Sequence, residues 1–126
     1  MANINMIKNL LFVAAGGGIG AVLRYAMYLL LKPQPFPFTT LLINIAGSFF
    51  IGIILAYSLK ENSFTESAKL FLATGICGGF TTFSAFSLEN MQLLQAGKYN
   101  IAIIYIGVSV VAGIAAAALG FKLINH

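Results

Sequence analysis

The stretch from Gly75 to Ser87, which reads GICGGFTTFSAFS, most restricts what this chain can fold into. It lies near the middle of a long apolar segment, yet Gly78 and Gly79 lack side chains and are followed by paired threonines. The backbone there can leave helical geometry and expose its own N–H and C=O groups. Polar backbone survives at membrane depth only where protein or a water-lined path covers it. The stretch therefore predicts a broken membrane helix with a binding site for a small ion or solute at the break.

Composition supports a membrane setting for this stretch. Hydrophobic residues make up 60% of the 126 positions and charged residues 8%, which is too apolar for a soluble domain of this length. The net charge of +4 is spread over seven basic residues without a cluster, so it indicates membrane flanks and no nucleic-acid partner. We expect an all-α, multi-pass protein of the cell membrane, with residues 1–126 forming a single membrane domain. Its helices are predicted at about 4–31, 39–59, 67–94 (broken near 78–82) and 101–124.

Polar residues recur every four positions on two of these helices. Asn44, Ser48 and Gly52 share one face of the second helix, and Tyr105 and Ser109 share one face of the fourth. An asparagine in a membrane helix often serves only as an interhelical hydrogen bond worth about 0.6 to 2 kcal/mol. Both packing and a polar path remain open from spacing alone.

Aromatic and charged residues surround the break. Phe83 and Phe86 are three positions apart and share a helix face beside Ser84. Phenylalanines at this spacing are usually core or lipid contacts, but these two adjoin an opened backbone. Glu89 lies beyond the break, where it is paired, extends to the interface or lines a vestibule. Arg24 either extends towards the headgroups or lines an anion entrance.

The charge balance bears on the assembly. Lys8, Lys60, Lys69 and Lys122 lie on the side of the termini, and Arg24, Lys32 and Lys98 lie towards the other side. With four basic residues on one side and three on the other, the positive-inside rule predicts no preferred orientation in the membrane. Four short helices are also too few to enclose a hydrated path of their own. An antiparallel homodimer, with its two-fold axis in the membrane plane, answers both difficulties.

Three stretches resemble the Fluc (CrcB) family of fluoride channels over nearly the whole chain. They are GGGIGAVLRY, TLLINIAGSFFIG and TGICGGFTTFSAFS, the last being highly specific. The resemblance implies a dual-topology homodimer with four transmembrane helices per subunit and a broken third helix. It also implies two fluoride pores in the membrane, a structural Na⁺ at the dimer centre, and a role in lowering cytoplasmic fluoride.

The resemblance also implies roles for individual residues. The pore residues match Asn44, Phe83 and Phe86, and the Na⁺ ligands match the backbone carbonyls of Gly78 and Thr81. The family's track of polar side chains matches Ser84, Tyr105 and Ser109. Its vestibule residues match Arg24 and Glu89. Ala85 and Gly113 stand where other members carry Thr or Ser, so we expect a track that is shorter here or differently arranged.

Other functional classes fit the residues less well. The chain has three carboxylates and a terminal His126, from which no nucleophile and base or metal-ligand cluster can be assembled, so we expect no enzyme. The alternative is a small dual-topology multidrug exporter coupled to protons. Such an exporter needs an ionisable residue deep in the membrane, yet Glu61 and Glu66 lie in a loop and Glu89 is off-centre. A structural membrane subunit, in which Asn44 and the glycines only pack helices, is a third class.

Overall fold

The computed structural model describes residues 2–60 and 64–125, so Glu61 and His126 lie outside it. Its elements run in the order α1 (Ala2–Leu30), α2 (Phe38–Ser58), α3 (Glu66–Lys69), the π-helix η1 (Leu70–Cys77), α4 (Gly78–Phe80), α5 (Phe83–Gln95) and α6 (Tyr99–Ile124). Elements α3 to α5 form one bent span over Glu66–Gln95. Within the described residues, this span and α1, α2 and α6 are four helices long and apolar enough to cross a membrane. The predicted all-α fold with four long apolar helices is thereby confirmed.

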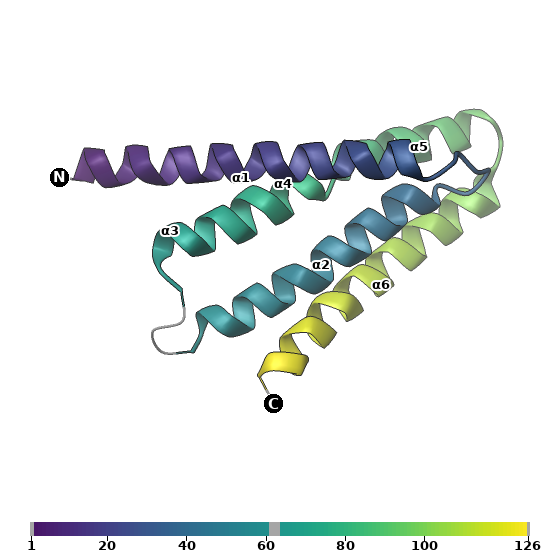
Figure 1. The fold of residues 1–126 in the computed structure, drawn as a ribbon. Helices are drawn as coiled ribbons and strands as arrows, with labels where there is room; N and C mark the ends of the chain where they lie inside the picture. Colours follow the sequence, from purple (N-terminus) through teal and green to yellow (C-terminus); the bar gives the residue numbers. More distant parts are fainter. Residues whose placement is uncertain (1, 61–63, 126) are drawn as a thin grey trace.

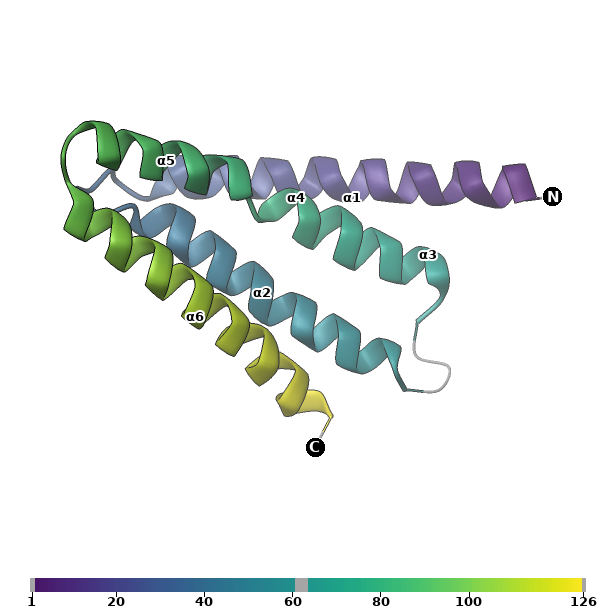
Figure 2. The ribbon, with the colours of Figure 1, turned by 180° about the vertical axis from the view of Figure 1, so that it is seen from behind.

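The four spans run side by side and connect alternately at the two ends of the bundle. Figure 1 places both termini and the connection after α2 towards one end, and the α1–α2 and α5–α6 connections at the other. Figure 2 shows from behind that a short non-helical segment separates α4 from α5. At the α5–α6 turn Gly97 has φ +75°, a conformation that glycine adopts without steric cost. The termini thus share one side, as an even number of spans requires.

Glycines let α1 approach the first half of the bent span closely. A Cβ atom at Gly20 would overlap the carbonyl oxygen of Ile76, and one at Gly79 would overlap that of Gly17. A Cβ atom at Gly75 would stand 2.8 Å from the Cα of Gly16. In a membrane, where lipid is as apolar as leucine, such close backbone packing is what holds helices together. The small residues of GGGIG therefore form a packing surface.

A second close crossing joins α2 to α6. A Cβ atom at Gly52 would overlap the carbonyl oxygen of Ala117, and one at Gly120 would overlap that of Phe49. Helix α2 begins at Phe38 without a side-chain cap. Thr40 lies inside the helix, and its hydroxyl bonds to Glu89 instead. The threonine is therefore committed to a contact between helices.

The third span leaves helical geometry at two threonines, and the glycines before them stay helical. Gly78 and Gly79 remain in α4, whereas Thr81 (φ −76°, ψ 156°) and Thr82 (φ −149°, ψ 117°) are extended. The reason is steric, because β-branched residues favour extended backbone while glycine here supplies close contact with α1. The predicted break near 78–82 is therefore present, and it falls on the last two residues of that range. The first half of the span is also unusual, since η1 is a π-helix, a form often found at functional sites.

The first crossing predicts a sharp contrast between neighbouring glycines. Gly20→Ala forces a methyl group into the Ile76 carbonyl and should lower the free energy of unfolding by about 1 to 3 kcal/mol. Gly18→Ala is the matched control, because a Cβ atom there meets no heavy atom within 4 Å. It should be neutral or gain about 0.5 to 1 kcal/mol from the loss of glycine freedom in a helix. Thermal unfolding of the detergent-solubilised variants measures the difference, and equal melting temperatures would contradict the crossing.

Candidate functional site

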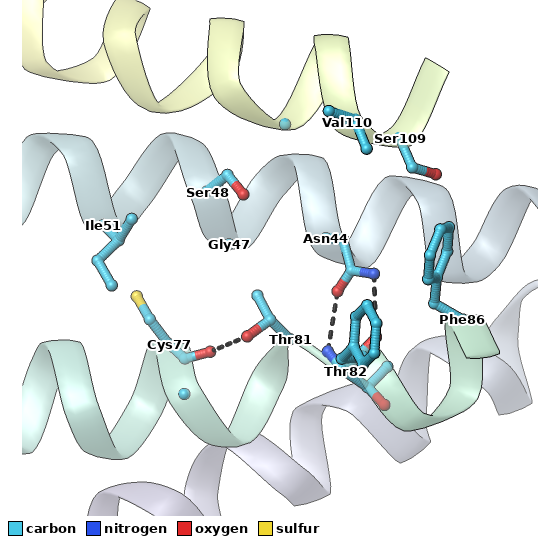
Figure 3. A pocket seen from close by; sticks show the side chains of 13 residues that line it. Asn44, Gly47, Ser48, Ile51, Cys77, Thr81, Thr82, Phe86, Ser109 and Val110 are labelled. Atoms are coloured by element: carbon cyan, nitrogen blue, oxygen red, sulfur yellow. Dashed lines mark hydrogen bonds between the residues drawn. The ribbon is translucent and has the colours of Figure 1, made fainter. Parts of the chain in front are cut away.

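One amide side chain holds the break open. Asn44 Oδ1 accepts the backbone N–H of Thr82 at 2.9 Å, and its Nδ2 donates to the Thr82 carbonyl at 3.1 Å. Figure 3 shows the two bonds running side by side from α2 to the extended segment. The Thr82 hydroxyl then accepts from the N–H of Ala85 at 3.0 Å and caps the start of α5. Two side chains thus satisfy both backbone groups of Thr82 and the N–H of Ala85, in a place where water is excluded.

These bonds deprive two carbonyl groups of their helical donors. In a continuous helix the Thr82 N–H would donate to Gly78 and the Ala85 N–H to Thr81. Both N–H groups donate to side-chain oxygens instead. The Thr81 hydroxyl is occupied as well, because it donates to the Cys77 carbonyl at 2.9 Å. What Gly78 and Thr81 offer a ligand is therefore the carbonyl oxygen, and carbonyl oxygens suit a hard cation.

A groove of about 370 Å³ opens along the break between α2, α6 and the bent span. Asn44, Gly78, Thr81, Phe83, Phe86 and Ser109 all line it, so six of the ten predicted site residues meet there. The remaining lining residues are Gly47, Ser48, Ile51, Cys77, Thr82, Val110 and Gly113. Figure 3 shows Asn44 and Ser48 from α2 facing the same space as Thr81 from the bent span. The groove, named here the break groove, combines an amide, hydroxyls and aromatic rings.

The two phenylalanines of the groove form an aromatic pair with unequal exposure. Their ring centroids are 5.7 Å apart at an interplanar angle of 41°. Phe86 also packs against Tyr105 at 5.0 Å, whereas Phe83 is 78% exposed in the single chain. Ring edges carry partial positive charge and can face an anion. Most of the Phe83 side chain is therefore left free by the packing of this chain, apart from its contact with Phe86.

The three predicted track residues are not brought together. Ser109 lines the break groove, and its buried hydroxyl has no hydrogen-bond partner among the described residues. Tyr105 is fully buried behind Phe86, and its hydroxyl donates to Glu89 at 2.7 Å. Ser84 is exposed outside the groove lining and contacts the Thr82 hydroxyl at 3.2 Å. Ser109 and Tyr105 thus lie near the groove on α6, while Ser84 lies apart.

Arg24 binds backbone at the break. Its Nε donates to the Gly79 carbonyl at 3.1 Å, and the side chain is half-buried. In a continuous helix that carbonyl would accept from Phe83, the first residue of α5. A guanidinium has further N–H donors beyond Nε, so positive charge stands at the end of the helix that precedes the break. The sequence suggested extension to the headgroups as one alternative, and this contact holds the side chain within the protein.

Glu89 is held by hydroxyl groups from two other spans. Its Oε2 accepts from Thr40 at 2.7 Å and its Oε1 accepts from Tyr105 at 2.7 Å. The Tyr28 hydroxyl lies 2.6 Å from that of Thr40. Neither Tyr28 nor Thr40 was identified from the sequence as part of a site. Their partners are 12 and 49 residues away in the chain, and helical spacing gives no signal for such contacts.

Comparison with known proteins places the chain in a family. Residues 11–121 match the family described as "CrcB-like protein, Camphor Resistance (CrcB)". A protein of Azobacteroides pseudotrichonymphae named "Fluoride-specific ion channel FluC" is 50% identical, with 94% of this chain and 97% of the relative covered. Relatives of the same name from Flavobacterium psychrophilum and Thermus thermophilus are 45% and 42% identical, covering 90% and 93% of this chain and 94% and 95% of their own lengths. The chain belongs to the CrcB-like protein family.

Proposed function

We propose that this protein is a fluoride-selective ion channel of the cell membrane that lowers cytoplasmic fluoride. The observation that carries the proposal is the break groove, where the Asn44 amide and the phenylalanine pair line one space with the Ser109 hydroxyl, which has no partner among the described residues. The named relatives, which cover nearly the whole chain, are fluoride-specific ion channels. The family is one of channels, so no catalytic residue is assigned.

The groove offers weak donors in series and no fixed positive charge among its lining residues. Asn44 Nδ2 has two hydrogens, of which the Thr82 carbonyl takes one and the other is left for a ligand. Ser109 supplies a hydroxyl hydrogen, and Phe83 and Phe86 supply ring edges. A small, strongly hydrated anion must exchange water for such donors. A path of several weak sites lets the ion enter and also leave.

The proposed Na⁺ would bind through the carbonyl oxygens of Gly78 and Thr81. Both groups lack their helical donors and line the break groove, so the residues present fit a hard cation. One chain contributes two such oxygens, and two copies meeting at the break contribute four. When bound, the ion would supply positive charge that holds two copies of the break together.

The proposed assembly is an antiparallel, dual-topology homodimer with two pores. A single copy leaves the groove open and Phe83 78% exposed, so its pathway residues lack a covering wall. The charge bias is weak, because four lysines on the side of the termini stand against Arg24, Lys32 and Lys98 towards the other side. A partner of opposite orientation would cover the groove with its own copy. The membrane lipid and this second copy are the expected partners.

A proton-coupled multidrug exporter remains the alternative. The feature that favours it is Glu89, which is half-buried and bonded inside the bundle, deeper than the sequence alone suggested. A groove lined by small residues and hydroxyls nevertheless lacks a carboxylate for a large organic cation. Flux of fluoride, chloride and an organic cation from liposomes containing the purified protein decides between the two. Fluoride flux alone supports the channel, and proton-driven cation flux supports the exporter.

Replacing the phenylalanines tests the pore directly. Phe83→Ile and Phe86→Ile keep an apolar group but remove the ring edge, so fluoride flux should fall by at least about tenfold, the factor that corresponds to 1.4 kcal/mol. Asn44→Asp should be equally damaging, because it places a negative charge on the path and turns a donor into an acceptor. Phe50→Ile is the matched control, since Phe50 is 54% exposed and pairs with Phe49 outside the groove.

Purification as a dimer with normal thermal unfolding separates this result from a folding defect. If Phe83→Ile and Phe50→Ile lower flux and dimer yield in the same proportion, the rings serve packing and the pore assignment is wrong.

Replacing Gly78 tests the sodium site and the dimer together. A Cβ atom at Gly78 meets nothing closer than the Ala73 carbonyl at 3.7 Å, so a larger side chain would not disturb this chain itself. Gly78→Leu should nevertheless abolish the dimer and fluoride flux, because the new side chain would project where the second copy and Na⁺ meet. Thr81→Val should retain both, since its hydroxyl serves Cys77 and not the ion. Gly107→Leu, at another open helical glycine, is the control.

Cross-linking in detergent and flux after exhaustive sodium removal provide the readouts. A dimeric, conducting Gly78→Leu protein would rule out a central site at this residue.

Orientation in the membrane tests dual topology. A cysteine added at the C-terminal end of a Cys77→Ser background should be accessible to an impermeant reagent in part of the population and protected in the rest. Two extra lysines at residues 60–69 should shift the ratio and reduce flux unless an oppositely biased copy is expressed with it. A single accessible class in intact cells would exclude the antiparallel arrangement.

A further inference from the structure

One polar cluster draws a residue from each of the four spans. Tyr28 of α1, Thr40 of α2, Glu89 of α5 and Tyr105 of α6 form a continuous chain of hydrogen bonds of 2.6 to 2.7 Å. Thr40 is 1% exposed and Tyr105 is fully buried. Beside these two buried side chains, each oxygen of the Glu89 carboxylate accepts one hydroxyl group.

The direction of the donors follows from hydrogen counting. A threonine hydroxyl has one hydrogen, and that of Thr40 is donated to Glu89. The 2.6 Å contact between Tyr28 and Thr40 must therefore be donated by Tyr28. All hydroxyls of the chain then point towards Glu89. The cluster is an anion site whose occupant is the protein's own carboxylate.

The cluster separates the break groove from a second cavity. Phe86 lines the groove and packs against Tyr105 at 5.0 Å, and Glu89 follows Phe86 by three residues on the same face of α5. The second cavity, also of about 370 Å³, is lined by Tyr28, Thr40 and Glu89 from the cluster. Lys32 and Lys98 line the same cavity from the two connections at this end of the bundle. Their positive charge favours an anion in the space beyond the cluster.

We propose that the Glu89 carboxylate is a tethered anion that competes with fluoride for the Thr40 and Tyr105 hydroxyls. This inference rests on the proposed function, because it concerns the passage of fluoride from the groove to the second cavity. Fluoride takes the two hydroxyls when the carboxylate swings away, and the returning carboxylate displaces fluoride onward. Tyr28 is a positioning residue, since its hydrogen bond polarises the Thr40 hydroxyl and strengthens its hold on the carboxylate.

Glu89→Gln tests the competition. The amide oxygen still accepts from Tyr105, but the NH₂ group cannot accept from Thr40 and the charge is gone. Fluoride should therefore bind the freed hydroxyl more tightly and leave more slowly. We expect the half-saturating fluoride concentration and the maximal flux both to fall several-fold, measured by flux from liposomes over a range of fluoride concentrations. A merely structural role would lower maximal flux without moving half-saturation.

Tyr28→Phe provides an independent test, because it removes one oxygen atom and no charge. The half-saturating concentration should fall in the same direction but less than in Glu89→Gln. Tyr25→Phe is the control, as Tyr25 lies on the same helix, is 63% exposed and lines neither cavity. If Glu89→Gln fails to fold, Tyr28→Phe decides the matter alone.

The outcomes distinguish this inference from the proposed function. A wild-type protein that conducts no fluoride overturns both. A conducting wild-type protein whose half-saturation stays unchanged or rises in Tyr28→Phe and Glu89→Gln overturns the competition and leaves the channel intact.

Discussion

The pair of hydrogen bonds between Asn44 and Thr82 is the interaction on which the rest of the site depends. An unsatisfied backbone group in hydrocarbon costs several kcal/mol, so a membrane helix can open only where other groups replace its bonds. The Asn44 amide, which belongs to the neighbouring helix α2, supplies both an acceptor for the Thr82 N–H and a donor for the Thr82 carbonyl. With Thr82 fixed, its hydroxyl caps α5, and the Gly78 and Thr81 carbonyls lose their helical donors as a direct consequence. The Asn44 side chain is therefore the first of the contacts that keep the break open, ahead of those made by Thr82 and Arg24.

The Asn44 clamp, meaning the two hydrogen bonds from Asn44 to Thr82, requires that the helices keep a fixed register relative to one another. The glycine contacts of α1 with η1 and α4, and of α2 with α6, bring backbones so near that a displaced register would force carbonyl oxygens into Cβ atoms. Gly47, which sits between Asn44 and Ser48 on α2, extends this argument to the break itself, because a Cβ atom there would overlap the Thr81 methyl group. The small residues thus fix the distance at which the Asn44 amide meets Thr82. Packing and polar chemistry depend on each other here.

How much could be predicted from the sequence depends on the range of each contact. The four apolar spans and the region of the break are local patterns, and the structure has both. The bond from Arg24 to Gly79 joins residues 55 apart, and that from Thr40 to Glu89 joins residues 49 apart. No helical period relates such pairs, because they depend on how whole spans cross. The break falls at Thr81 and Thr82 and not at the glycines for a similar long-range reason, because Gly79 packs against the backbone of α1 at Gly17.

The break also offers a physical reason why the two sites proposed above, for ions of opposite sign, would lie side by side in one short chain. A helix that ends at Phe80 presents carbonyl oxygens, the negative end of its dipole, while the side chains around a new helix start at Phe83 present donors. Gly78 and Thr81 line the break groove from the end of the first half of the span, and Phe86 lines it from the second half, together with Asn44 and Ser109 of the neighbouring helices. A cation proposed at the first set would leave the second set to an anion, with the Asn44 clamp as the boundary. The two proposed sites are therefore consequences of one interruption in a helix, and neither could be kept if the helix were continuous.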